Sequence, residues 1–190
     1  EANIYHFICN YKQNKRPQSY CVTINTLRLD TIYSQDQLLA LIEPKIIEMD
    51  CILLDIFGGG FNNRHAAGDI FALIVDMNKT ALVFGVATNW LTQGYSIEGR
   101  FMTEKYHAMQ YVKTPIKGNN CSLGKINEPW HPIVRNLKSF TFKGWSARFS
   151  APLEDNSIVI AEWADGIPFI VEKKEQTKRL IVLNFGLPSS

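Results

Sequence analysis

The sequence predicts a flavodoxin-like α/β domain with a doubly wound, mainly parallel sheet, helices on both faces and an antiparallel C-terminal extension. In the first half of the chain β-prone and helix-prone segments alternate, which is typical of a parallel sheet built from crossover units. Two of the β-prone segments are almost continuously apolar, as strands covered on both faces are. The last third of the chain contains β-prone runs separated by short turns, which predict the antiparallel extension.

The first two predicted strands are residues 4–9 and 20–27. The polar residues 10–19 between them have little to bury and predict an exposed loop. A helix is predicted to begin after Ser34, because Ser34 and Gln37 have the spacing of a capping box. Apolar residues at helical spacing give this helix one buried side, and a proline inside it must kink or divide it.

The next three elements form a strand–helix–strand unit. Residues 51–57 and 80–86 are predicted to be buried strands, and residues 69–77 carry apolar side chains at helical spacing. Glycines 58–60 follow the first of these strands directly. The connections are short enough for right-handed crossovers within one sheet.

The second half begins with a long excursion, residues 89–129, in which glycines and prolines repeatedly break the periodicity. One short helix is expected within it, at residues 103–111. Asp165–Gly166 is a hairpin turn signal, because glycine readily adopts a positive φ. It lies among four β-prone runs: 139–142, 158–163, 169–172 and 180–185.

Composition limits the class of protein. The chain has 190 residues, of which 46% are hydrophobic and 20% charged, so collagen-like, coiled-coil and disordered classes are excluded and residues 1–190 are expected to form one domain. The net charge of +2 is too small for a nucleic-acid-binding protein. A membrane-spanning helix needs about 20 apolar residues, and every apolar run in this sequence is far shorter. Because the chain starts at Glu1 without an initiator Met, we expect a domain of a longer, eukaryotic protein.

The four cysteines predict neither a metal site nor a cofactor. Cys9, Cys21, Cys51 and Cys121 have no zinc-ligand spacing, and a domain of this size needs no disulfides to form a core. We therefore expect reduced cysteines in the cytoplasm rather than a secreted protein, with a Cys9–Cys21 pair as the alternative.

The C-terminal segments resemble the class I glutamine-amidotransferase-like superfamily. The similarity is greatest to members without amidotransferase activity, such as the ThuA-like proteins and the N-terminal domain of an intraflagellar-transport subunit. Four segments carry it: His131–Ile133, Ser157–Trp163, Asp165–Val171 and Arg179–Phe185. This resemblance implies the same fold class as the residue patterns do.

The resemblance also implies that the amidotransferase machinery is missing. Catalytic members have a nucleophilic cysteine after the strand that corresponds to residues 80–86, where this chain has Ala87. A methyl group cannot attack a glutamine amide. The His-x-Glu pair of those enzymes is absent as well, since neither Glu162 nor Glu172 has a histidine two positions before it. The resemblance therefore implies a pseudoenzyme.

Candidate binding residues follow the two buried strands. Gly59 and Gly60 come after the first, where open α/β sheets bind ligands and where a glycine run lets an anion approach the backbone. A tight turn explains the same glycines. Arg64 and His65 are the polar residues nearest to them, and Asn89 and Trp90 follow the second strand, so that these groups are expected to share one edge of the sheet. The candidate set is completed by two residues of the second half, His131 and Trp145.

His131 precedes a proline and is expected in an extended turn, either as a structural hydrogen-bonding residue or as a catalytic base. Trp145 lies between basic residues in a segment expected to be a loop, where an exposed aromatic residue can anchor a partner.

Three functions remain open. The preferred interpretation is a non-catalytic domain that recognises a protein partner or a ligand. The alternatives are a hydrolase that uses Asp55, His65, Asn89 or His131 in a non-standard site, and a carbohydrate-binding module.

Overall fold

The computed structural model describes residues 36–37, 40, 43–44, 51–55, 64–77, 81–85, 98–110, 112, 116–175 and 178–185. The expected strands at residues 4–9 and 20–27, with Cys9 and Cys21, lie outside this part of the chain. Of the helix expected after Ser34, residues 36–37, 40 and 43–44 are described, and they are helical.

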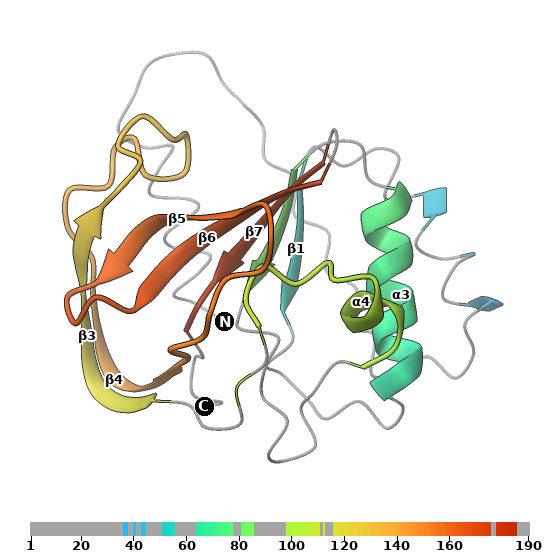
Figure 1. Cartoon of the computed structure of the whole chain (residues 1–190), viewed down its shortest axis with the longest axis horizontal. Helices are drawn as coiled ribbons and strands as arrows, with labels where there is room; N and C mark the ends of the chain where they lie inside the picture. The colour runs from blue at the N-terminus through green and yellow to red at the C-terminus, as the bar shows by residue number, and fades with distance from the viewer. Residues whose placement is uncertain are drawn as a thin grey trace.

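A seven-stranded sheet in the order β1-β2-β7-β6-β5-β3-β4 organises the described residues (Figure 1). Two neighbouring pairs, β1 with β2 and β2 with β7, are parallel. The other four neighbouring pairs are antiparallel. The strands are β1 (Cys51–Asp55), β2 (Ala81–Gly85), β3 (Ile116–Ile126), β4 (Thr141–Arg148), β5 (Ser157–Trp163), β6 (Pro168–Glu175) and β7 (Lys178–Leu183).

The predicted fold class is therefore wrong. Most of the sheet is antiparallel and it curls like half of a barrel, with β3 and β4 turned away from the parallel strands (Figure 1). Helices are few in the described ranges: besides the helical residues at 36–37, 40 and 43–44, they are α3 (Arg64–Met77) and α4 (Arg100–Thr103). A flavodoxin-like, doubly wound sheet does not fit this arrangement, and neither does the amidotransferase-like fold, with its ThuA-like variant, that the resemblance implied.

The error has a local cause at β3. Its glycines suggest a broken excursion, yet Ile116–Ile126 form an 11-residue strand that joins β4 to β5. A Cβ atom on Gly124 would lie 2.4 Å from the main-chain oxygen of Trp163. This glycine allows two strands to approach closely instead of ending one. The short helix expected at residues 103–111 is also misplaced, because α4 ends at Thr103.

Several smaller predictions hold. The segments expected at 51–57 and 80–86 contain β1 and β2, and the segment expected at 69–77 lies within α3, which begins earlier, at Arg64. Asp165–Gly166 forms the turn between the antiparallel strands β5 and β6, and Gly166 has a φ of 81°. This positive φ is the conformation that favours glycine at such a turn.

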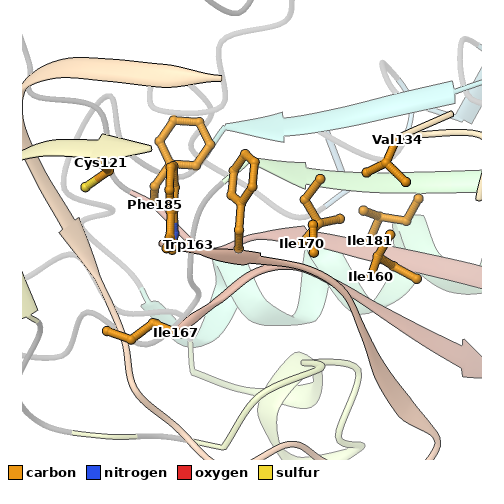
Figure 2. Packing of buried hydrophobic residues seen from close by; sticks show 10 residues of the cluster. Cys121, Val134, Ile160, Trp163, Ile167, Ile170, Ile181 and Phe185 are labelled. Atoms are coloured by element: carbon orange, nitrogen blue, oxygen red, sulfur yellow. The ribbon is translucent and has the colours of Figure 1, made fainter. Parts of the chain in front are cut away.

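Two apolar clusters cover the two faces of the sheet. Successive side chains of a strand point to opposite faces, so Val171 of β6 joins the cluster under α3 and α4, whereas Ile170 joins the other. Figure 2 shows part of the second cluster, in which Val134 lies near Ile160 and Ile181. Burial on both faces explains the short apolar runs Phe169–Val171 of β6 and Leu180–Val182 of β7.

Aromatic side chains fill one end of the second cluster. The rings of Trp163 and Phe169 have centroids 4.1 Å apart, and Phe185 meets Trp163 edge-on at 5.8 Å. Trp163 Nε1 donates a hydrogen bond of 3.1 Å to the main-chain oxygen of Asn184. The buried indole therefore has its polar group satisfied, as such side chains require.

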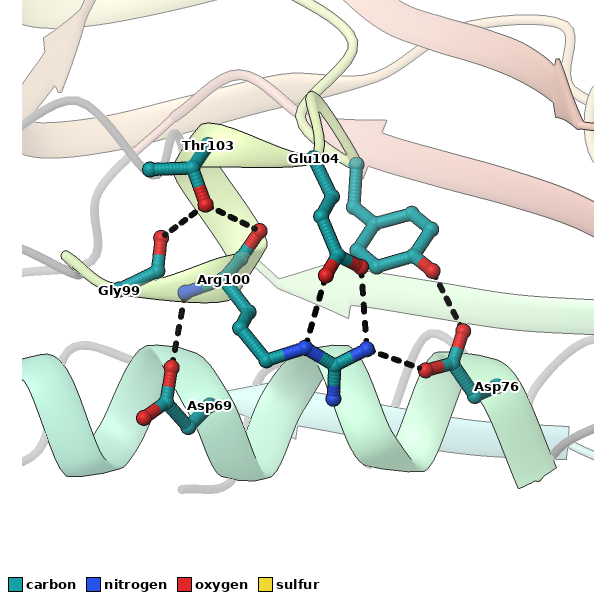
Figure 3. A network of polar contacts seen from close by, with 7 residues as sticks. Asp69, Asp76, Gly99, Arg100, Thr103 and Glu104 are labelled. Carbon is teal, nitrogen blue, oxygen red and sulfur yellow. Dashed lines mark hydrogen bonds and ion pairs between the residues drawn. The ribbon is translucent and has the colours of Figure 1, made fainter.

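A polar network attaches α4 to α3 on the other side (Figure 3). Arg100 donates from Nε to Glu104 Oε1 and from Nη2 to Asp76 Oδ2, both at 2.8 Å. Its main-chain nitrogen donates to Asp69 Oδ1, also at 2.8 Å. Hydrogen bonding to Arg100 lowers the pKa of the Glu104 carboxyl. These groups are solvent-exposed, so the network orients the short helix more than it stabilises it.

Candidate functional site

Two successive residues in the middle of β6 are charged and buried. Glu172 and Lys173 are 1% and 2% exposed. Because they are successive residues of a strand, they point to opposite faces of the sheet. A buried charge is costly unless it is paired, so each must find its partners in the segment that covers its face.

Glu172 meets His131. His131 Nε2 lies 3.5 Å from Glu172 Oε1, and the two side chains are 8% and 1% exposed. The main-chain N–H of Ile133 donates to His131 Nδ1 over 3.3 Å. A ring nitrogen that accepts carries no proton, so in the neutral ring the proton is on Nε2, which faces Glu172. The imidazole is held at both of its nitrogens.

The loop that carries His131, residues 127–138, is attached at several points and is called the His131 loop below. Its first residues, Asn127 and Glu128, donate main-chain hydrogen bonds of 2.9 and 3.2 Å to the oxygen of Ile160 on β5. Val134, only 2% exposed, packs in the second apolar cluster. The side chain that precedes His131 is therefore presented by an ordered backbone.

That side chain is Trp130, which is 86% exposed. Two further side chains lie beside the same buried pair. Ile158 of β5 is 39% exposed and is the register partner of Glu172. Lys174 Nζ lies 4.0 Å from Glu172 Oε2. We call Trp130, Ile158 and Lys174 the Trp130 surface.

The opposite face holds a second polar cluster. Lys173 Nζ donates to the main-chain oxygens of Lys105 and His107, the latter over 3.5 Å. His107 Nε2 lies 3.1 Å from Glu154 Oε1. Burial lowers the pKa of His107 although Glu154 opposes the shift. Among the described residues, His107 Nδ1 is buried without a hydrogen-bond partner, and so is Ser157 Oγ.

A pocket of about 100 Å³ lies near the β3–β5 contact. Arg148 Nε donates to Asp165 Oδ2 at 3.0 Å, and Arg148 Nη1 donates to the buried sulfur of Cys121 over 3.0 Å. The guanidinium is thus shared between a carboxylate and a thiol. Its ion pair with Asp165 leaves it less available to an incoming anion.

The expectation that the candidate residues after the two buried strands share one edge of the sheet stays a prediction, because most of them lie outside the described residues. Gly59, Gly60, Asn89 and Trp90 lie outside it, as does Ala87. Arg64 and His65 open α3, and Asp55 ends β1.

The other two candidates lie in the second half. Trp145 belongs to β4 and not to a loop, which corrects the expectation for that segment. His131 is in a turn as expected, with a buried carboxylate as its neighbour.

Sequence reasoning missed the two residues that define this region. Trp130 looks like one more core tryptophan of an aromatic-rich half, although Pro129 and Pro132 flank the Trp130–His131 pair and mark an exposed turn. Glu172 fails the His-x-Glu pattern because no histidine lies two positions before it. Its histidine comes from a segment 41 positions away, 172 − 131, which no spacing rule could find.

No family model and no curated protein matches this sequence. Among solved structures, the chain is similar to the cytoplasmic protein STM3548 from Salmonella typhimurium, with a TM-score of 0.53 and 13% identity. The match covers 82% of this chain and 65% of that one, so the chain spans less than two thirds of its neighbour's length. At this identity the likeness concerns the fold alone.

Two further observations apply to the described ranges. They contain no helix long and apolar enough to cross a membrane. Nor do they contain a group of three or more His, Cys, Asp or Glu side chains arranged to hold a metal ion.

Proposed function

We propose that this chain is a non-catalytic recognition domain that binds a protein partner through the Trp130 surface. The observation that carries the proposal is the 86% exposure of Trp130 on a loop whose next residue is fixed by a buried carboxylate. Tryptophan is enriched among the residues that dominate binding energy at protein interfaces. A cytoplasmic location belongs to the same proposal, supported by the description of the structural neighbour as cytoplasmic.

The attachment of the His131 loop supports binding because it lowers the entropy that association costs. An anchor on an ordered turn loses less conformational freedom than one on a mobile segment. The turn is closed by main-chain hydrogen bonds from His131 to Glu128 and from Val134 to His131, at 3.0 and 3.1 Å. Trp130 lies inside this hydrogen-bonded turn.

The same geometry favours recognition over hydrolysis. A catalytic histidine needs one nitrogen to exchange a proton with substrate or nucleophile. In His131, Nδ1 accepts from Ile133 and Nε2 faces Glu172. The pair is buried, so its geometry supports a role in fixing the loop.

The test compares proteins captured by the wild-type chain with those captured by Trp130→Ala, using quantitative mass spectrometry. Ile116→Ala is the matched control, because Ile116 is also an exposed apolar residue (40%) but begins β3, away from the Trp130 surface. We expect one or more proteins to be lost with Trp130→Ala and retained with Ile116→Ala. Thermal unfolding of both variants should match the wild type, since neither side chain is buried.

Equal capture by the two variants would contradict the proposal. A glycan array provides the second arm, because an exposed tryptophan can also stack on a sugar. Trp130-dependent glycan binding without Trp130-dependent protein capture would replace the proposal with a carbohydrate-binding module.

A further inference from the structure

The charges around the Trp130 surface identify the kind of partner it fits. We infer that the partner is an acidic peptide segment that places an apolar side chain on Trp130 and Ile158 and a carboxylate on Lys174. This inference rests on the proposed function and specifies the chemistry of the ligand.

The three residues of the surface lie around one face of the sheet. Glu172 and Lys174 are two positions apart on β6, so their side chains leave the same face. Ile158 is directly opposite Glu172 in the antiparallel pair of β5 and β6. The His131 loop covers that face and reaches Glu172 through His131 Nε2. Apolar and cationic groups therefore stand next to each other around one buried carboxylate.

Cations predominate among the exposed charges of the adjoining segments. The side chain of Lys174 is 64% exposed. Arg135 and Lys138 are exposed on the His131 loop itself, and Lys125 is exposed on β3 just before the loop begins. The exposed acid of the loop is Glu128.

Two acids close to this surface are already engaged, whereas Asp155, in the turn before β5, is exposed. Glu172 is buried against His131. Glu162 Oε1 accepts a 2.7 Å hydrogen bond from Asn127 Nδ2 at the start of the loop. The exposed basic residues of these segments still outnumber the exposed acids, Glu128 and Asp155. The excess of positive charge around an apolar centre complements a carboxylate that flanks an apolar side chain.

An extended peptide suits this surface better than a folded surface of opposite charge does. Trp130 and Ile158 are its two exposed large apolar residues, which matches one or two apolar side chains of a peptide. Interfaces of this kind take their affinity from a central anchor and their specificity and association rate from peripheral charges.

The experiment selects peptides from a random display library on the intact chain, so that the natural partner need not be identified first. Selected peptides are synthesised and their affinities measured by fluorescence anisotropy. We expect them to be rich in Asp and Glu around an apolar or aromatic residue. We expect Lys174→Glu to weaken them by about tenfold or more, as the reversal of a charge at an interface does. Lys143→Glu is the control, because Lys143 is an exposed lysine of β4 outside this surface.

The outcomes separate the two proposals. Peptides that need Trp130 but are neutral or basic, or that bind Lys174→Glu as tightly as wild type, would overturn the acidic partner and leave the recognition function standing. Failure to select any peptide whose binding depends on Trp130 would overturn the peptide ligand, whereas equal protein capture by Trp130→Ala and Ile116→Ala would contradict the recognition function itself.

A lipid surface is tested separately, since tryptophan and lysine also occur together at membrane interfaces. Vesicles of phosphatidylcholine with and without phosphatidylserine are sedimented with the chain. If the chain sedimented with the anionic vesicles in a Trp130-dependent way, and if the selected peptides prevented this sedimentation, an anionic membrane would replace the acidic peptide as the ligand. We expect no sedimentation with either vesicle.

Discussion

At the scale of single residues, two buried charged residues organise the region around β6. They are adjacent in sequence, and their side chains point to opposite faces of the sheet. Glu172 and Lys173 each fix a covering segment, the first through His131 and the second through the main-chain oxygens of residues 105 and 107. A buried charge tolerates few alternative partners, so each interaction specifies where one segment lies. Both residues should therefore affect loop position as well as stability.

Glu172→Ala should separate these two effects. Removing the carboxylate takes away the group that faces His131 Nε2, and a buried polar group that loses its partner costs about 1–3 kcal/mol. Urea unfolding should show this loss, and binding of a Trp130-dependent ligand should weaken as well. Glu172→Gln retains an acceptor oxygen and should recover most of the binding. If Glu172→Ala were destabilised but bound the ligand normally, the carboxylate would not position the loop.

The pH dependence of stability should report His107. Its pKa is lowered in the folded chain by burial, from an ordinary value of 6.5. The unfolded chain then binds protons more readily, so the free energy of unfolding should be constant above about pH 6.5 and should fall as the pH is lowered below it. Denaturant titrations at several pH values would measure this slope. His107→Gln should flatten it, and an unchanged slope in that variant would assign the effect to another group.

At the scale of elements, the sequence patterns located segments better than they assigned pairings. The apolar segments at 51–57 and 80–86 contain β1 and β2, and the periodic segment at 69–77 lies in α3, because hydrophobic periodicity is a local property. β3 was missed because its glycines look like breaks. Gly124 is required for a non-local reason: the backbone of Trp163 lies where the Cβ atom of residue 124 would be.

Gly124→Ala tests this explanation of β3. Its Cβ atom would lie within 3 Å of three main-chain atoms of Trp163 and Ala164, so two strands must separate. Overpacking of this kind typically costs about 1–3 kcal/mol. Gly118→Ala on the same strand is the control, because its Cβ atom would meet only the end of the Arg148 side chain, at 3.2 Å. Chemical denaturation should show a large loss for the first and a small one for the second. Equal losses would mean that the glycines matter for backbone freedom rather than for close approach.

At the scale of the whole molecule, the order of the strands was the part that the sequence could not supply. β7, the last strand, lies between β2 and β6, which joins the parallel strands of the first half to the antiparallel strands of the second. Strands of either kind have similar local patterns, so a single sequence does not say which distant segment a strand will pair with. The candidate site was missed for the same reason: His131 and Glu172 meet only after β5 and β6 pair and the loop folds over them.

The organisation of the second half makes the Trp130 surface a property of the fold. The turn that bears Trp130 is attached to β5 by hydrogen bonds, to β6 by His131 and to the apolar cluster by Val134. An exposed tryptophan held by three such attachments is suited to binding. Recognition of a partner through Trp130 is therefore the function on which the other proposals depend.

Recognition is best tested by the affinity of the purified chain for a captured protein partner, measured by titration calorimetry for wild type, Trp130→Ala and Ile116→Ala. We expect a loss of at least about 2 kcal/mol in binding for Trp130→Ala, the size expected of an interface hot spot, and little change for Ile116→Ala. Indistinguishable affinities for all three proteins would show that the exposed tryptophan does not bind the partner.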